Sequence, residues 1–248
     1  MTKRIQDPNQ QIALFIDADN APASSISLVL SDMARYGVVS IRRAYGNWKS
    51  PHLQSWEAVL HENAIQPIQQ FDLIKGKNAS DMALAIDVMD VLYLKNVHTI
   101  GLMSSDCDFT PLATRVLSDG VQVIGYGEKK TPQPFVRSCS RFLLLEKEIT
   151  NQPSNDEKCL FKTQDKLKCD TKLINLLREA VSAHEEEDGW AHLGRIGSHI
   201  SNHDSFDSRN YGYKKLSELF LAIDLFETKI ASGNHLWVKH KRSHPKKV

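Results

Sequence analysis

Carboxylates recur in this sequence where an apolar run ends or a helical pattern begins. Asp17 and Asp19 follow one apolar run, Asp106 and Asp108 follow another, and Asp81 begins a helical pattern. The carboxyl ends of parallel strands meet at one edge of an open α/β sheet, where ligands bind. Because crowded carboxylates repel one another, such a cluster usually requires a cation. Hard oxygen ligands suit Mg²⁺ or Mn²⁺ rather than zinc, so the sequence predicts a Mg²⁺ or Mn²⁺ site.

Alternating strand and helix patterns predict the elements that carry these residues. Strands are expected over 11–16, 38–45, 65–71, 97–103, 121–126 and 141–145, and helices over 26–36, 52–63, 81–94, 111–117 and 132–138. This alternation predicts an α/β fold with a parallel sheet covered on both faces. In the helix over 81–94, the expected apolar side consists of Met82, Ala85, Ile86, Met89 and Leu92.

A second unit is predicted after the α/β domain, which we place at residues 1–149. Residues 150–170 are polar and contain Pro153, which predicts a linker. Residues 171–240 then show helical patterns over 171–184, over 190–200 and from Tyr211 through Ile223, followed by a hairpin of 226–230 with 235–239. This order predicts a small winged helix-turn-helix with Trp190 in its core. Residues 241–248 form a basic tail.

The bulk composition is that of an ordinary globular protein. The chain has 248 residues, 41% of them hydrophobic and 25% charged, and a net charge of +1, so no global field points to nucleic acid. No signal peptide or membrane span is visible. The four cysteines show no paired spacing, which favours reduced thiols and a cytoplasmic location.

The three acidic stretches resemble the NYN domain family, the LabA-like group of PIN-type nucleases, over residues 11–146. The resemblance rests on Phe15-Ile16-Asp17-Ala18-Asp19-Asn20, on Lys77-Asn78-Ala79-Ser80-Asp81 and on Ser104-Ser105-Asp106-Cys107-Asp108-Phe109, in the family's order and spacing. It implies a PIN-like Rossmannoid fold and a Mg²⁺- or Mn²⁺-dependent ribonuclease. PIN-type sites are often shared in dimers, which leaves a homodimer open.

The second unit resembles the LOTUS domain, also called OST-HTH. The resemblance rests on Gly189-Trp190, Phe206-Asp207, Tyr211-Gly212-Tyr213-Lys214-Lys215-Leu216 and the final apolar strand around Trp237. It implies RNA binding, or binding of a protein partner such as a helicase.

In the nuclease interpretation, Asp17, Asp81, Asp106 and Asp108 hold one or two ions. A metal lowers the pKa of a bound water and neutralises charge on the phosphate, so no Ser, Cys or His nucleophile is needed. The helix dipole is expected to favour ionised Asp81. Asn20 is expected to orient Asp17 or a water. The alternative for a single Asp at a strand end is an Asx-turn or a helix cap. Asp19 is either a second ligand or a solvated loop residue, and the loop interpretation is preferred.

Six basic residues are candidates for RNA contact. They are Arg42, Arg43, Lys75, Lys77, Lys214 and Lys215. The two arginines lie near Tyr45 and Trp48, a mixture typical of single-strand stacking platforms. The alternative is that the lysines are solvated and that the arginines belong to an ordinary strand.

Two other functions remain open from the sequence. Asp17-Ala18-Asp19 resembles the motif of haloacid-dehalogenase-type phosphatases, in which the first Asp is a nucleophile, although Asn20 departs from their pattern. The second alternative is a non-catalytic RNA-binding adaptor in which the LOTUS-like unit carries the function.

Overall fold

The computed structural model describes residues 10–71, 78–145, 164–203, 205–231 and 235–241. The chain divides into two compact units, Met1–Asn151 and Gln152–Val248. Every helix in the described ranges is too short or too polar to cross a membrane.

The first unit alternates strands and helices. Its elements are β1 Gln11–Asp17, α1 Ile26–Met33, β2 Val38–Gly46, α2 Trp56–Glu62, β3 Gln66–Gln69, α3 Ala79–Leu94, β4 Thr99–Met103, α4 Thr110–Ser118, β5 Gln122–Gly127, α5 Gln133–Arg137 and β6 Arg141–Leu144, with short 3₁₀ helices at Ala23–Ser25, Pro51–Leu53 and Cys107–Phe109. The strands form one parallel sheet in the order β3-β2-β1-β4-β5-β6. The predicted α/β class and parallel sheet are confirmed.

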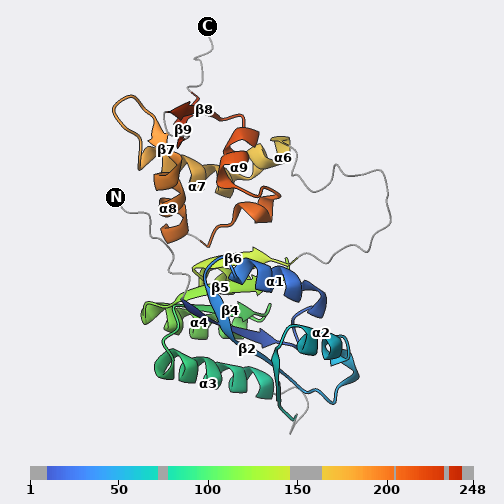
Figure 1. The fold of residues 1–248 in the computed structure, drawn as a ribbon. Helices are drawn as coiled ribbons and strands as arrows, with labels where there is room; N and C mark the ends of the chain where they lie inside the picture. The colour runs from blue at the N-terminus through green and yellow to red at the C-terminus, as the bar shows by residue number, and fades with distance from the viewer. Residues whose placement is uncertain (1–9, 72–77, 146–163, 204, 232–234, 242–248) are drawn as a thin grey trace. The chain divides into compact units, whose positions relative to one another are not determined.

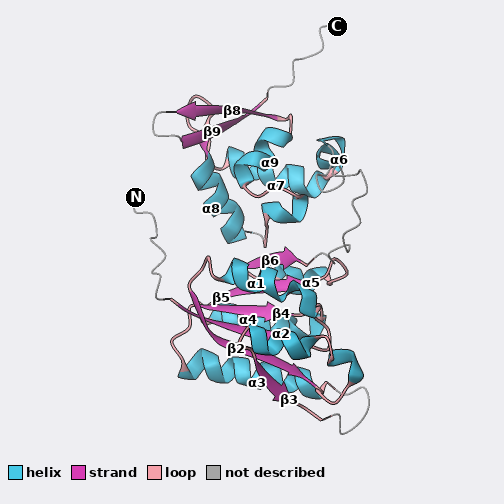
Figure 2. Cartoon of the chain, turned by 45° about the vertical axis from the view of Figure 1, so that its right-hand side comes forward, coloured by secondary structure: helices cyan, strands magenta, loops and turns pink. Residues whose placement is uncertain are grey.

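Strand β1 is buried on both faces of the sheet, as expected for a central parallel strand. Ile12, Leu14 and Ile16 pack in a core with α1 and α2, whereas Ala13 and Phe15 pack in a second core with α3, α4 and α5. Figures 1 and 2 show α1 and α3 on opposite sides of the strands. The two layers therefore hold β1, and the residues that follow it, in a fixed place.

Helix α3 turns a different side to the sheet from the one predicted. Leu84, Val88 and Val91 are buried, whereas Met82 and Ile86 are 63% and 57% exposed. The other three residues of the predicted apolar side are only partly buried. Because apolar residues occur almost all round this helix, their spacing alone did not define which side meets the sheet.

The second unit is a small helical domain with a three-stranded sheet. Its elements are α6 Gln164–Cys169, α7 Thr171–Ser182, β7 Ala191–His192, α8 Leu193–His203, a 3₁₀ helix at Ser208–Tyr211, α9 Leu216–Ala222, β8 Phe226–Ala231 and β9 His235–His240. The strands pair antiparallel in the order β7-β9-β8, and Figure 2 shows the β8–β9 hairpin. The predicted winged helical domain is confirmed, although the turn of the hairpin lies outside the described residues.

Three local features of this unit differ from the prediction. Helix α6 lies inside residues 150–170, for which a linker was predicted, and its Leu167 is fully buried in the core of the unit. The helix expected from Trp190 is preceded by strand β7 and begins at Leu193. The helix expected from Tyr211 begins at Leu216, because Gly212 adopts a left-handed conformation with φ of 88°.

Trp190 also differs from its prediction. Its side chain is half-buried and lies outside the apolar core of the unit.

Candidate metal centre

The sheet topology brings two acidic stretches together at its carboxyl edge. Strand β1 lies between β2 and β4, the point where the strand order reverses. Asp17 is the last residue of β1, and the stretch from Ser104 to Asp108 follows β4 directly. Helix α3 supplies the third stretch in its first turn, which contains Asp81. Ligands of open α/β sheets bind at such a crevice.

Asp17 is the most deeply buried of the carboxylates. Asp17 is only 1% exposed. Its Oδ2 accepts hydrogen bonds from Asn20 Nδ2 at 3.0 Å and from Ser104 Oγ at 2.6 Å. Its Oδ1 is buried without a hydrogen-bond partner among the described residues. Burial raises the pKa of Asp17, and the hydrogen bonds from Ser104 and Asn20 oppose that rise. An unpartnered buried acceptor is costly, and a cation would satisfy it.

Ser104 joins the acidic stretch that follows β1 to the one that follows β4. Its Oγ donates to Asp17 and accepts a hydrogen bond from the backbone N–H of Asp106 at 3.0 Å. Asp106 Oδ1 in turn accepts from the backbone N–H of Asp108 at 2.9 Å and so caps the 3₁₀ helix Cys107–Phe109. One oxygen of Asp106 therefore caps a helix, as the alternative for a single Asp supposed. This hydrogen bond fixes the direction of the carboxylate.

The pKa of Asp81 is raised to about 6. Burial is the main cause, and the negative charges of Asp17, Asp106, Asp19 and Asp108 add to it. The net shift is opposite in direction to the one expected from the helix dipole, because burial and the neighbouring carboxylates dominate it. The same repulsion shows that the three acidic stretches lie close enough to interact.

The start of α3 is tied to both acidic loops by hydrogen bonds. Ser80 Oγ donates to Asp19 Oδ2 at 3.1 Å, and Asn78 Nδ2 donates to Asp108 Oδ2 at 3.2 Å. Asp19 is exposed, as expected of a loop residue, but it faces the start of α3 and contributes to the field at Asp81. Asp19 was not among the predicted metal ligands, because the loop interpretation was preferred for it. The signal that could have included it is its Asp-x-Asp spacing with Asp17, the same spacing as in Asp106-x-Asp108.

The donor set fits a hard divalent cation. The side-chain ligand atoms of Asp106, Cys107 and Asp108 lie within 4.8 Å of one another, the only group of three candidate ligands so close in the described part of the chain. The carboxylates of the three stretches therefore lie farther from one another than the direct ligands of a single ion would. Such spacing suits Mg²⁺, which keeps several waters and takes few carboxylates. Cys107, a soft ligand, was not in the predicted set.

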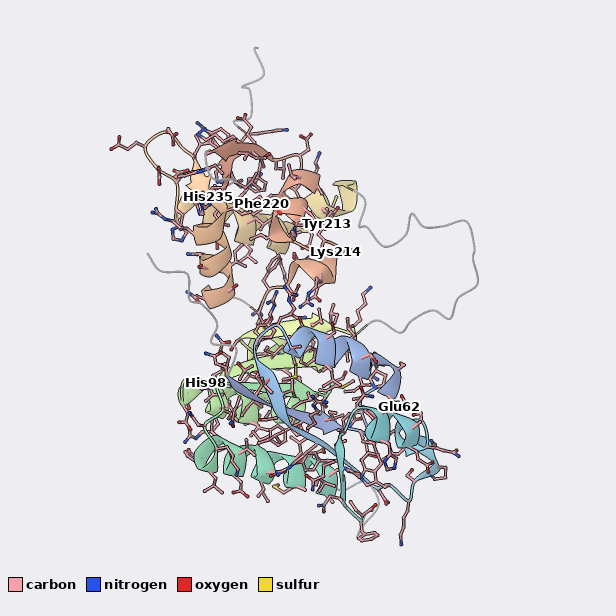
Figure 3. The ribbon with its side chains drawn as sticks, viewed as in Figure 1. Glu62, His98, Tyr213, Lys214, Phe220 and His235 are labelled. Atoms are coloured by element: carbon pink, nitrogen blue, oxygen red, sulfur yellow. The ribbon has the colours of Figure 1, made fainter. Side chains whose placement is uncertain are left out.

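The basic residues predicted to contact RNA differ in their surroundings. Arg42 donates to the carbonyl oxygens of Val39 and Asn63 at 3.2 and 2.8 Å, and Arg43 forms an ion pair with Asp87. Both guanidinium groups thus have partners inside the domain. Lys75 and Lys77 lie outside the described residues. Lys214 and Lys215 are exposed just before α9, where Figure 3 labels Lys214.

The predicted stacking platform is divided between core and surface. Tyr45 is 1% exposed and packs against Phe15 with ring centroids 6.3 Å apart, so it offers no face to RNA. Trp48 is only partly buried and lines a cavity of about 560 Å³ together with Lys49, Leu53 and Pro67.

Comparison with known families gives two matches. The NYN domain matches residues 11–146, and the OST-HTH/LOTUS domain matches residues 165–238, which confirms both resemblances. NYN domains are typically nucleases that use divalent metals, and OST-HTH domains bind RNA. No curated protein matches the chain. Among solved structures, a protein of unknown function from Vibrio parahaemolyticus matches with a TM-score of 0.48 and 17% identity, over 59% of this chain and 97% of that one.

Proposed function

Since the chain belongs to the NYN domain family, we propose that it is a metal-dependent ribonuclease whose OST-HTH/LOTUS domain binds the RNA. We place catalysis in residues 1–149 and RNA binding in the second unit. The substrate class follows from the pairing of a nuclease-type domain with an RNA-binding domain in one chain.

The observation that carries the proposal is the unpartnered Oδ1 of Asp17. This oxygen is buried without a hydrogen-bond partner among the described residues, while the other oxygen of the same carboxylate has two donors. Asp17, Asp81, Asp106 and Asp108 would hold Mg²⁺ or Mn²⁺. The ion, when bound, supplies a water of lowered pKa and neutralises charge on the phosphate.

The neighbouring polar residues have positioning roles in this proposal. Asn20 and Ser104 hold Oδ2 of Asp17, which leaves Oδ1 for the cation. Ser104 Oγ also accepts a hydrogen bond from the backbone N–H of Asp106. A movement of either Asp17 or Asp106 would therefore displace the other through Ser104. Asn78 and Ser80 keep the first turn of α3, and therefore Asp81, beside the two loops. Such outer partners typically contribute about 10- to 100-fold to metal affinity or activity.

The test is cleavage of end-labelled single-stranded and structured RNAs with Mn²⁺, Mg²⁺ or EDTA. We expect wild-type cleavage to require metal. Asp17→Asn and Asp106→Asn should each lower the rate by at least about 10- to 100-fold, the effect of losing an outer partner of a metal, because each removes a negative charge that holds the ion. Asp90→Asn, an exposed position on α3 away from the cluster, is the matched control and should cleave like the wild type. Thermal stabilisation by Mn²⁺ should be lost in the two site variants alone.

Two results would contradict the assignment. Metal-dependent cleavage that persists in both site variants would show that these carboxylates do not form the site. RNA binding in EDTA without cleavage under any metal condition would favour the non-catalytic adaptor.

A further inference from the structure

The sheet of the second unit has one face in the core and one face outside it. Val238 of β9 and Ala191 of β7 pair with each other and are fully buried. The next pair in the register is His192 with Trp237, and on the other side of β9 Trp237 pairs with Lys229 of β8. Because neighbouring residues of a strand point to opposite faces, these three side chains lie on the outer face.

The outer face is a mixture of aromatic rings and amino groups. Lys229 Nζ lies 4.2 Å from the ring centroid of Trp190 and 5.9 Å from that of Trp237. The ring of His192 lies 5.4 Å from that of Trp237 and 5.1 Å from that of His235. Both tryptophans are only partly buried, and His235 is exposed. Four rings and an ammonium group therefore lie together on a surface of the domain.

Both lysines of this face have a polar contact with Asp188 and lie beside the Trp190 ring. Lys229 pairs with Asp188 at 3.6 Å, and Lys239 Nζ lies 5.8 Å from the Trp190 ring and donates to the carbonyl oxygen of Asp188 at 2.6 Å. An exposed ion pair contributes about 0–1 kcal/mol, so Lys229 can leave Asp188 for a phosphate at little cost. Lys239 can replace its hydrogen bond to the carbonyl oxygen by one to a phosphate oxygen. The aromatic faces that they cover would then be free for another flat ring.

Stacked bases beside a phosphate backbone are the ligand that this face fits. Every base has a π-face, and proteins that bind single strands combine aromatic platforms with basic grooves. The positive charge of Lys229 and Lys239 on this face is complementary to a phosphate backbone.

We propose that Trp190 and Trp237, with Lys229, Lys239 and the two histidines, form the platform on which single-stranded RNA bases stack. The proposal rests on the proposed RNA-binding function and assigns it a surface. This surface differs from the Lys214–Lys215 stretch predicted from the sequence. Figure 3 labels His235 and Lys214 at separate places on the domain, His235 with the hairpin and Lys214 before α9.

The first test measures the affinity of the full chain, in EDTA to prevent cleavage, for a fluorescein-labelled single-stranded RNA of mixed sequence. Trp190→Ala and Trp237→Ala should each weaken binding by about 5- to 150-fold, the effect of losing one stacked base. Tyr93→Ala, which removes an exposed ring from α3 in the first unit, is the matched control and should leave affinity unchanged.

A second pair of variants adds charge and removes no ring. Glu227 is exposed and pairs with Lys239 across the hairpin, so Glu227→Lys places a cation on the outer face. We expect this variant to bind RNA more tightly. A plot of the logarithm of the binding constant against the logarithm of the salt concentration should be steeper by about 0.7, the value for one added phosphate contact. Glu179→Lys makes the same change on an exposed position of α7 and should give a smaller gain.

The outcomes separate the platform from the function on which it rests. A wild-type chain that binds no RNA would overturn both proposals. RNA binding that is unchanged in both tryptophan variants would overturn the platform alone. Should those variants fail to fold, crosslinking of the wild type to 5-bromouridine RNA decides the matter. Adducts on Trp190, Trp237 or His235 support the platform, and adducts only elsewhere overturn it.

Discussion

A carboxyl group with a raised pKa connects the chemistry of the site to the stability of the protein. The pKa of Asp81 is about 6 in the metal-free fold, against about 3.9 in an unfolded chain. The native state therefore binds this proton more tightly than the unfolded state does. The resulting stabilisation is complete below the unfolded value and is lost as the pH rises through about 6, because the native carboxylate is then crowded by other charges. Asp17, whose pKa is also raised, acts in the same direction.

We therefore expect the metal-free protein to lose stability between about pH 5 and about pH 7.5, with Asp81 contributing about 1 kcal/mol after allowance for solvent screening. Urea unfolding in EDTA at both pH values measures this loss in the free energy of unfolding. Asp81→Asn should reduce the loss, Asp90→Asn should not, and Mn²⁺ should restore stability at the higher pH. An identical pH dependence in Asp81→Asn and the wild type would contradict this account.

Single residues of the site were predictable when the argument used their type and their order along the chain. The positions of Asp17 and Asp106 at strand ends followed from the apolar runs before them. The roles of the arginines did not follow, because Arg43 is paired with Asp87, a residue of α3 that no local pattern connects with β2. Long-range partners of this kind depend on tertiary packing, which the sequence pattern does not contain.

At the scale of elements, the buried side of α3 determines where Asp81 lies. Leu84→Ala should lower the free energy of unfolding of the first unit by about 2–5 kcal/mol, because it leaves a cavity against the sheet. Ile86→Ala, one of the residues predicted to be buried, should change it by less than about 0.5 kcal/mol. Denaturant unfolding of the two variants compares them directly. A larger loss in Ile86→Ala than in Leu84→Ala would contradict the observed orientation of the helix.

The class and order of the elements were predictable, whereas their faces and ends were less so. The alternation of strands and helices predicted the parallel sheet, because that alternation is imposed by the fold itself. The side of α3 was missed since its exposed surface is also apolar. The start of α9 was missed since a turn at Gly212, rather than helical spacing, decides it.

For the whole molecule, the boundary of the second unit is a testable consequence of α6. Leu167 is fully buried with residues of α7 and β9. Leu167→Ala should therefore destabilise the second unit by about 2–5 kcal/mol and leave the unfolding of the first unit unchanged. Circular dichroism melts of the full chain, with Leu84→Ala as the reciprocal variant, should show separate effects. A shift of both transitions in either variant would contradict the division into independently folding units.

The pairing of β1 with β4 has a consequence for the synthesis of the protein. Ile12 pairs with Thr99, so the first strand leaves the ribosome long before its neighbour in the sheet exists. At about 5–20 residues per second, several seconds pass before that neighbour is made. Asp106 and Asp108 follow it immediately, so the acidic residues meet only when most of the first unit has been translated. For the proposed ribonuclease, this order keeps the growing chain inert until most of its first unit has been made.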